Sequence, residues 1–252
     1  MVNSFQFKQK IQTRQPMIGS MLTLDSSEVA EIYAAAGYDW LFVDMEHSTL
    51  DPKSAQRILQ AVGNSCPCVL RPPCFDEAWI KKTLDTGAAG ILLPRVNSAA
   101  QAQQILRFCK YPPTGCRSVG LTRAQGYGTQ FEEYLAHANH DIAVIIQIED
   151  IAAINNIEEI VAVPGIDALF IGPYDLSGSM GKTGQVKDPE VLAQIEKVRR
   201  AGLEAGLAVG IFTVNPADVK SLLQQGFTLI TVGVDTSILS KTLKETLQLI
   251  RN

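Results

Sequence analysis

The sequence predicts one (β/α)₈ barrel, and three observations lead to that prediction. Strand-like apolar runs alternate eight times with helical patterns along the chain. The length of 252 residues is close to the roughly 250 that such a barrel typically needs. A hydrophobic content of 46% is ample for one core, and no linker, internal repeat or low-complexity segment divides the chain. We therefore expect residues 1–252 to form a single domain.

The eight expected strands are short apolar runs rich in Ile, Val, Leu and Phe. Such runs suit strands that are buried on both faces, as in a parallel sheet. They are Met17–Met21, Trp40–Asp44, Pro67–Arg71, Gly90–Leu93, Val144–Ile148, Ala168–Ile171, Ala208–Phe212 and Leu229–Val232.

Helical patterns follow these strands in turn, and several carry start signals. Asp51-Pro52, Asp188-Pro189 and Asn215-Pro216 each place a capping side chain before a proline that suits the first helical turn. The expected helices are 26–36, 52–62, 76–86, 98–109, 150–162, 189–205, 215–225 and 236–250.

The main irregularity is the segment 110–142, which is too long for a plain helix-to-strand connection. It contains Tyr111-Pro112-Pro113, several glycines and a short helical pattern near 130–138. Inserts of this length in a compact domain are usually functional or face a partner.

Composition excludes several classes of function. The net charge is −4 and there is no basic tract, so nucleic acid is not an expected partner. No apolar run reaches the roughly 18 residues needed to cross a membrane, and the polar start of the chain lacks a signal-peptide core. The five cysteines show no CxxC pair, which favours reduced thiols and a cytoplasmic protein.

Two carboxylates are expected at the same rim of the barrel. Glu149 closes the fifth strand and Asp175 follows the sixth, and catalytic groups of parallel barrels collect beyond the carboxyl ends of strands. Two such carboxylates, with no third acidic cluster nearby, suit one Mg²⁺- or Mn²⁺-type ion that keeps positions open for water and substrate. The alternative is that Glu149 caps the next helix and Asp175 serves a turn.

Other polar groups are expected at this rim. His47, after the second strand, is placed for proton transfer, and Arg71, after the third, can stabilise a carboxylate or a developing oxyanion. Gln147 shares a side of its strand with Glu149, and the turn Gly172–Asp175 offers backbone N–H groups to a small carboxylate. A surface histidine and a structural salt bridge are the competing interpretations for His47 and Arg71.

A metal ion, a base and an oxyanion-binding arginine together favour proton or carbon–carbon chemistry next to a carbonyl. No lysine stands at a strand end, so a Schiff-base mechanism is not expected. Replacing Arg71 with alanine is expected to abolish most turnover with little effect on the fold.

The chain also resembles the metal-dependent (class II) pyruvate aldolases of the HpcH/HpaI family. That family includes 4-hydroxy-2-oxo-heptane-1,7-dioate aldolases and 2-dehydro-3-deoxyglucarate aldolases, and the resemblance covers nearly the whole chain. Its motifs are Asp39-Trp40, Asp44-Met45-Glu46-His47, Arg71-Pro72, Leu84-Asp85-Thr86-Gly87-Ala88, Tyr111-Pro112-Pro113, Gly115-Cys116-Arg117-Ser118-Val119-Gly120, Gln147-Ile148-Glu149, Phe170-Ile171-Gly172-Pro173-Tyr174-Asp175-Leu176-Ser177, Ser179-Met180-Gly181 and Val232-Gly233-Val234-Asp235.

This resemblance implies a TIM barrel of the phosphoenolpyruvate/pyruvate-binding type and a set of roles. Glu149 and Asp175 would hold a divalent ion (Mg²⁺, Mn²⁺ or Co²⁺), and Arg71 would stabilise the enolate-like transition state. Gln147 and the turn at Tyr174 and Asp175 would contact pyruvate.

The resemblance further implies that His47 accepts the proton and that Asp85 raises its basicity. Asp85 falls near the end of an expected helix and not at the rim, so we expect it to reach the site of a neighbouring subunit. The family's hexameric habit makes that arrangement reasonable. Asp44 is the substitute candidate for the role. Tyr174 and Ser118 depart from the family's usual residues, and Arg123 is a candidate either for binding the distal part of the aldehyde or for a surface role.

The implied activity is reversible cleavage of a 4-hydroxy-2-oxo acid to pyruvate and an aldehyde, through a pyruvate enolate held on the ion. The alternatives are a citrate-lyase-type enzyme acting on a CoA thioester, a decarboxylating or cyclising relative, and a non-catalytic barrel that binds a 2-oxo acid. An enzyme for a CoA thioester needs a basic groove for the CoA phosphates, which the sequence does not show. A non-catalytic barrel would not need the proton-accepting His47.

Overall fold

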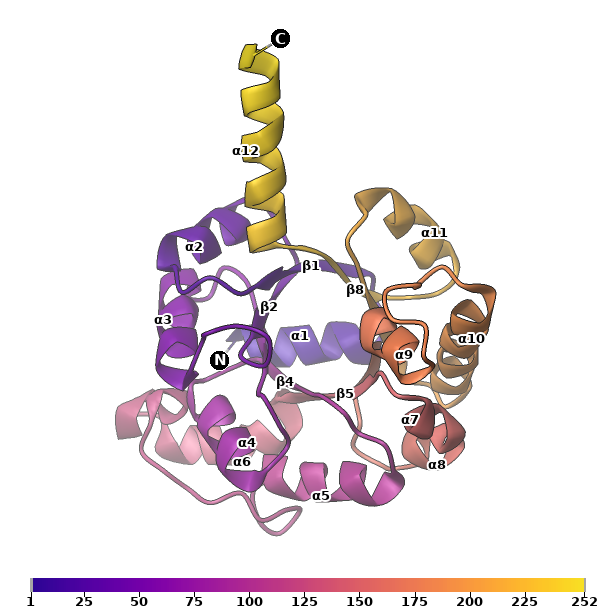
Figure 1. Ribbon diagram of the computed structural model, residues 1–252. Helices are drawn as coiled ribbons and strands as arrows, with labels where there is room; N and C mark the ends of the chain where they lie inside the picture. The colour runs from indigo at the N-terminus through magenta and orange to yellow at the C-terminus, as the bar shows by residue number, and fades with distance from the viewer. Residues whose placement is uncertain (1, 252) are drawn as a thin grey trace.

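Eight parallel strands close into a barrel, as the sequence predicts. The computed structural model describes residues 2–251, with side chains from Ser4 onward, and the strand order is β1-β2-β3-β4-β5-β6-β7-β8 with β8 paired to β1. Figure 1 looks along this barrel, with the helices arranged around it.

The strands lie within two residues of their expected bounds at every end. Buried apolar side chains on both faces fix them, because inward residues fill the barrel and outward residues pack under helices. The bounds are β1 Met17–Leu22, β2 Trp40–Asp44, β3 Cys68–Arg71, β4 Gly90–Leu93, β5 Ala143–Ile148, β6 Ala168–Ile171, β7 Ala208–Thr213 and β8 Leu229–Val234.

Six of the eight expected helices agree with the structure, and two differ. The helices α2 Ser27–Ala35, α3 Pro52–Val62, α4 Glu77–Asp85 and α5 Ala99–Cys109 match. The expected helix 150–162 is instead two short helices, α7 Ile151–Asn155 and α8 Ile157–Val161, which meet at Asn156.

The later helices complete the ring. The helix α10 spans Pro189–Glu204, and the expected helix 215–225 is a 3₁₀ turn, η2 Pro216–Asp218, followed by α11 Val219–Gln224. The predicted capping residues act as expected: the Asp51, Asp188 and Asn215 side chains accept from backbone N–H groups in the first turns of their helices.

A helix before the first strand, α1 Val2–Gln12, was not expected, because this stretch is mostly polar. Its apolar residues Phe7 and Ile11 are nevertheless fully buried, and they belong to the same cluster as Trp40 inside the barrel. Figure 1 shows α1 lying across the barrel axis behind the strands. Gly19 leaves the space for Trp40, since a Cβ there would come within 2.6 Å of the indole. At the amino end of the strands, the interior of the barrel is therefore filled by α1 and by large aromatic side chains.

The segment 110–142 packs at the amino-terminal end of the strands. It contains a short 3₁₀ segment, η1 Arg123–Gly128, and the helix α6 Phe131–Asp141, which matches the helical pattern expected near 130–138. The buried Arg117 holds the segment in place, because its guanidinium lies 4.6 Å from the Tyr111 ring centroid and 5.8 Å from that of Tyr134.

The last helix, α12 Asp235–Arg251, points away from the barrel (Figure 1). Its apolar side chains Ile238, Leu239, Leu243 and Leu247 are all exposed. No helix within residues 2–251 combines the length and apolar character required of a membrane span.

Candidate active site

A cavity of about 320 Å³ lies at the carboxyl ends of the strands. Its floor is made by Phe42 and Phe170, whose rings meet edge to face with centroids 5.8 Å apart. The polar groups of its wall come from the ends of different strands, as expected for a barrel of this kind. The polar residues that line it are Thr23, Asp44, His47, Arg71, Gln147, Tyr174, Asp175 and Thr236.

Arg71 is fixed by Asp44 on the neighbouring strand. Its Nε and Nη2 atoms donate to Asp44 Oδ1 and Oδ2, each at 2.8 Å, and its carbon Cζ lies 5.0 Å from the centroid of the Phe42 ring. Asp44 also accepts from the backbone N–H groups of Glu46 and His47, which shapes the loop after β2. A rigid guanidinium with a fixed orientation suits recognition of a planar anion.

Gln147 links Arg71 to Glu149. Arg71 Nη1 donates to Gln147 Oε1 at 3.1 Å, and Gln147 Nε2 donates to Glu149 Oε2 in a short hydrogen bond. The other oxygen of Glu149 accepts from the backbone N–H of Arg95 at 2.8 Å. Each carboxylate oxygen of Glu149 thus accepts one hydrogen bond, and the two bonds together fix the orientation of the carboxylate.

Glu46 is a third carboxylate in this group, and the expectation of only two was wrong. Burial raises the pKa of Glu149 to about 7, with further contributions from the nearby negative charges of Glu46 and Asp175. Burial also raises the pKa of Glu46. Glu46 follows β2 directly and precedes His47, so its place at the rim was visible in the sequence, but no role was assigned to it.

The Oε2 atom of Glu46 is buried and has no hydrogen-bond partner. It lies 3.1 Å from Arg71 Nε without hydrogen-bond geometry and 3.8 Å from His47 Nε2. This buried oxygen therefore has the positive charge of Arg71 nearby but makes no hydrogen bond, so it keeps a free acceptor position.

His47 lies at the mouth of the cavity, with 63% of its side chain exposed. Its Nε2 lies 3.8 Å from the carboxylate of Glu46. An exposed imidazole beside a carboxylate can exchange protons with both substrate and solvent.

Tyr174 and Asp175 lie in the first turn of a short helix, α9 Pro173–Ser179, where the sequence suggested only a turn. Pro173 occupies the first helical position, for which its fixed φ is suited. The Tyr174 ring packs against Phe212 of β7, with centroids 6.2 Å apart. The structure therefore brings His47, Arg71, Gln147, Glu149, Tyr174 and Asp175 to one rim.

Asp85 is the exception. It ends α4 and pairs with Arg117 at 2.7 Å, under the segment 110–142, and it does not line the cavity. Helices of this barrel end at the amino-terminal face, so Asp85 lies on the opposite side of its own chain from the rim.

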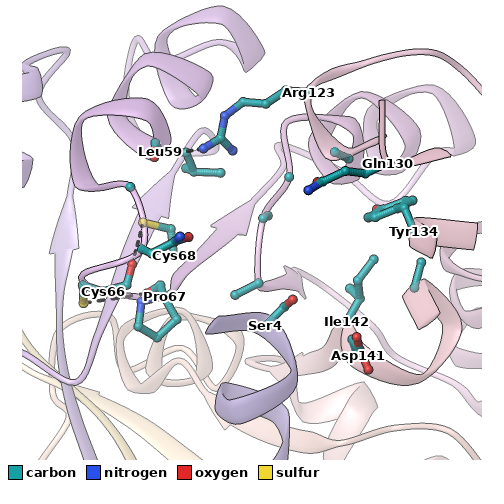
Figure 2. Close-up of a pocket in the computed structure, with 17 residues that line it drawn as sticks. Ser4, Leu59, Cys66, Pro67, Cys68, Arg123, Gln130, Tyr134, Asp141 and Ile142 are labelled. Carbon is teal, nitrogen blue, oxygen red and sulfur yellow. Dashed lines mark hydrogen bonds between the residues drawn. The ribbon is translucent and has the colours of Figure 1, made fainter. Parts of the chain in front are cut away.

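Arg123 also lies away from the rim, in a second cavity of about 220 Å³ at the amino ends of the strands (Figure 2). Its Nη1 donates to the carbonyl of Thr86 and its Nη2 to that of Leu59, so it satisfies carbonyls near the ends of α4 and α3. Burial raises the pKa of the Cys66 thiol beside this cavity to about 12, which makes the thiol unreactive. Arg123 has a structural role here.

The rim fits a divalent ion in an open site. Residues 2–251 contain no group of three or more acidic, histidine or cysteine side chains arranged to enclose a metal. Glu149 and Asp175 instead offer hard oxygen donors at adjacent strand ends, and Glu46, whose Oε2 makes no hydrogen bond, adds negative charge. Oxygen donors with unfilled positions suit Mg²⁺ or Mn²⁺.

The chain is similar to known proteins over almost its whole length. Residues 18–242 match the family model described as HpcH/HpaI aldolase/citrate lyase. The chain is 40% identical over 242 residues to hydroxypyruvate/pyruvate aldolase of Pseudomonas aeruginosa, covering 95% of this chain and 90% of that protein. It is 40% identical over 239 residues to 4-hydroxy-2-oxo-heptane-1,7-dioate aldolase of Shigella sonnei, covering 93% and 90%.

Among solved structures, an HpcH/HpaI aldolase/citrate lyase family protein from Burkholderia cenocepacia superposes with a TM-score of 0.95 at 35% identity. The match covers 98% of this chain and 100% of that one.

Proposed function

This chain belongs to the HpcH/HpaI aldolase/citrate lyase family and is a carbon–carbon lyase, and we propose that it cleaves a 4-hydroxy-2-oxo acid to pyruvate and an aldehyde with the help of a divalent ion. The observation that carries the proposal is the continuous chain of contacts from Asp44 through Arg71 and Gln147 to Glu149. These contacts hold the guanidinium of Arg71 beside a group of carboxylates at the rim. A 2-oxo acid bound there would meet positive charge at its keto oxygen and at its carboxylate.

Enzymes of this family generally depend on a divalent metal ion. In our proposal Glu149 and Asp175 hold the ion, and Mg²⁺, Mn²⁺ and Co²⁺ are the candidates. When bound, the ion supplies positive charge to the keto and carboxylate oxygens of the oxo acid and so stabilises negative charge that develops there.

The protein's own groups supply the rest of the reaction. Arg71 points into the cavity with its orientation fixed by Asp44, so its charge is in place where the pyruvate oxygen becomes negative. The backbone N–H groups of Tyr174 and Asp175, in the first turn of α9, are free of intrahelical acceptors and can receive the substrate carboxylate. Gln147 keeps Arg71 and Glu149 at a fixed spacing.

His47 is the proposed proton acceptor. It takes the proton from the 4-hydroxyl group, the bond between carbon 3 and carbon 4 breaks, the aldehyde leaves, and the electron pair moves into the enolate of pyruvate. Protonation of that enolate at carbon 3 gives pyruvate. Glu46, 3.8 Å from His47, is the acid within this chain that stabilises the protonated imidazole, and Asp85 is retained as a candidate that would act from a neighbouring subunit.

The test is release of pyruvate from 4-hydroxy-2-oxo acids after EDTA treatment and after addition of Mn²⁺. Turnover that disappears with EDTA and returns with Mn²⁺ is the expected result. Full turnover of a metal-free preparation would refute the metal proposal, and absence of pyruvate with every 4-hydroxy-2-oxo acid would refute the reaction.

We further propose that the protein is a homo-oligomer, a hexamer by family resemblance, in which α12 packs on a second copy. The exposed apolar face of α12 supports this, because such a face is unfavourable in water. Asp235 anchors the start of the helix by accepting from the backbone N–H groups of Thr23 and Leu24, so α12 leaves the barrel at a fixed point. A sedimentation mass equal to one chain would contradict the proposal.

The cytoplasm is the proposed location. All five cysteines are free, and Cys74 and Cys116 are exposed, which suits a reducing compartment.

A further inference from the structure

A large cavity lies directly behind the proposed reaction site, and nothing in the proposed mechanism uses it. It has a volume of about 760 Å³ and is formed by α10, α11 and the outer side of β7. These helices and α9 are neighbours on one side of the barrel (Figure 1). We propose that this cavity receives an uncharged, apolar tail on the aldehyde half of the substrate. The inference rests on the proposed aldolase function and adds the class of aldehyde.

The two cavities are neighbours that share three lining residues. Pro173, Tyr174 and Phe212 line both the cavity of about 320 Å³ and the larger one. The tilted ring pair of Tyr174 and Phe212 forms the wall between them. No residue within 2–251 hydrogen-bonds to the Tyr174 hydroxyl, so only packing holds this ring in its place. A substrate that fills the smaller cavity therefore meets an aromatic wall on the side of the larger one.

The inner surface of the larger cavity is apolar. Ile195 of α10, Ile211 of β7 and Phe227 are buried there, and Leu192 and Leu222 complete the wall from the two helices. A cavity of this volume lies in the range of small-ligand sites, which are lined mainly by apolar side chains. Burial of an alkyl or aryl tail here is favourable in proportion to the apolar area removed from water.

The charges around the cavity disfavour an acidic tail. Asp188 and Asp218 line it with Lys187, and Asp188 already accepts from Lys182 at 2.7 Å. In the smaller cavity the permanent cation is Arg71, which is engaged by Asp44 and Gln147. With Lys182 paired to Asp188, and Lys187 set against Asp218, a second carboxylate at the far end of the substrate would find no net positive charge here. The tail that fits is neutral.

The other occupant to consider is an apolar helix of a second copy, such as α12. The shared wall favours the substrate, because Tyr174 and Phe212 border both cavities and so place the larger one next to a tail that starts at the aldehyde carbon. The experiment separates these two occupants.

The experiment compares kcat/KM for four 4-hydroxy-2-oxo acids under saturating Mn²⁺. Beyond carbon 4 they carry a methyl, an n-pentyl, a phenyl or a carboxyethyl group. We expect kcat/KM to rise about two- to fourfold per added methylene in the alkyl series. The phenyl acid should also exceed the methyl acid, and the carboxyethyl acid should fall at least about tenfold below the n-pentyl one.

The variant Leu222→Trp fills the cavity from α11 without touching the smaller cavity. It should lower kcat/KM for the n-pentyl acid by about tenfold or more and leave the methyl acid unchanged. Gln224→Trp, an exposed position on the same helix outside the cavity wall, is the matched control and should change neither. If Leu222→Trp does not fold, Ile195→Phe fills the same space from α10 and serves instead.

Each outcome is decisive. Cleavage of the methyl acid with no discrimination among tails overturns this inference and leaves the proposed function standing. Loss of oligomer mass in Leu222→Trp with an unchanged tail preference assigns the cavity to a second copy and also overturns it. Cleavage of none of the four acids is a failure of the proposed function itself.

Discussion

Arg71 and Asp44 form a two-point ion pair between neighbouring strands, with both N–O distances at 2.8 Å and both side chains buried. The pair means that Arg71 has a structural role in addition to its proposed chemical one. Breaking a buried ion pair by removing one partner typically costs about 3–5 kcal/mol. Arg71→Ala is therefore expected to destabilise the fold as well as to abolish most turnover.

Arg71→Lys is the more informative change. Lysine keeps the charge but cannot reproduce the two-point contact with Asp44 or the third contact with Gln147. We expect the variant to stay folded and to lose about 10²–10³ in kcat. Thermal unfolding and steady-state kinetics measure the two effects. Activity within twofold of wild type would show that catalysis does not need the fixed guanidinium of Arg71.

Glu149→Gln tests the proposed metal ligand. The side chain keeps its size and can still accept from the Arg95 N–H, but it loses the charge. Affinity for Mn²⁺, measured by calorimetry, should fall by at least about 100-fold, whereas the unfolding temperature should change little, because the relief of repulsion from Glu46 and Asp175 is offset by the loss of the hydrogen bond from Gln147 Nε2. Tight Mn²⁺ binding by the variant would exclude Glu149 as a ligand.

Glu46→Gln tests the acid that sequence reasoning passed over. The change removes the buried oxygen that lacks a partner and the acidic neighbour of His47, 3.8 Å away. We expect kcat to fall by about tenfold or more with a folded protein. The control is Glu77→Gln, which changes an acid at the start of α4, outside the cavity. Equal kcat in the two variants would remove Glu46 from the mechanism.

Asp85→Asn separates a structural role from a catalytic one. Its 2.7 Å pair with the buried Arg117 predicts a loss of about 1–3 kcal/mol in the free energy of unfolding. If Asp85 also serves the His47 of a neighbouring subunit, kcat falls in the folded oligomer and its pH profile changes. A destabilised variant with wild-type kcat and pH profile would leave Asp85 a purely structural acid.

Lys110 gives a prediction for stability against pH. Its ammonium is buried at the amino end of the barrel, where it donates to the Asn139 carbonyl at 2.6 Å and lies near Lys8 and Asp167. Burial, followed by the charge of Lys8, lowers its pKa to about 8. An unfolded lysine titrates near 10.4.

Between about pH 8 and 10 the unfolded chain therefore binds more protons than the folded one, so stability rises with pH across that window. Below pH 8 both states are protonated and this contribution is constant. The gain is of order 1 kcal/mol, since the site is only partly sealed from water. Urea denaturation at pH 7.5 and 9.5 measures it, and Lys110→Met should lack it. The same rise in the methionine variant would assign the effect to other groups.

The strands were predictable from the sequence because both of their faces are buried. A strand covered on both faces is apolar along most of its length, as in β4 and β6, whereas the helices bury only one face. By contrast, α1 was missed because it buries only a narrow stripe with Phe7 and Ile11, and nothing local shows that this stripe closes the barrel.

The rim was predictable for a related reason. Residues that follow parallel strands meet at one edge, so the order of the strands alone brings Arg71, Gln147 and Glu149 together. Contacts between loops do not follow from strand order. The ion pair of Asp85 with Arg117 and the carbonyl contacts of Arg123 depend on how the segment 110–142 folds back, which a one-dimensional pattern does not encode.

The helix α1 that closes the amino end of the barrel has a kinetic consequence. With that end filled by Phe7, Ile11 and Trp40, reactant and both products share one exit at the rim. The proposed pyruvate position is the deeper one, beside Arg71, so the aldehyde departs first and pyruvate last. Such an ordered release makes pyruvate a competitive product inhibitor and the aldehyde a noncompetitive one.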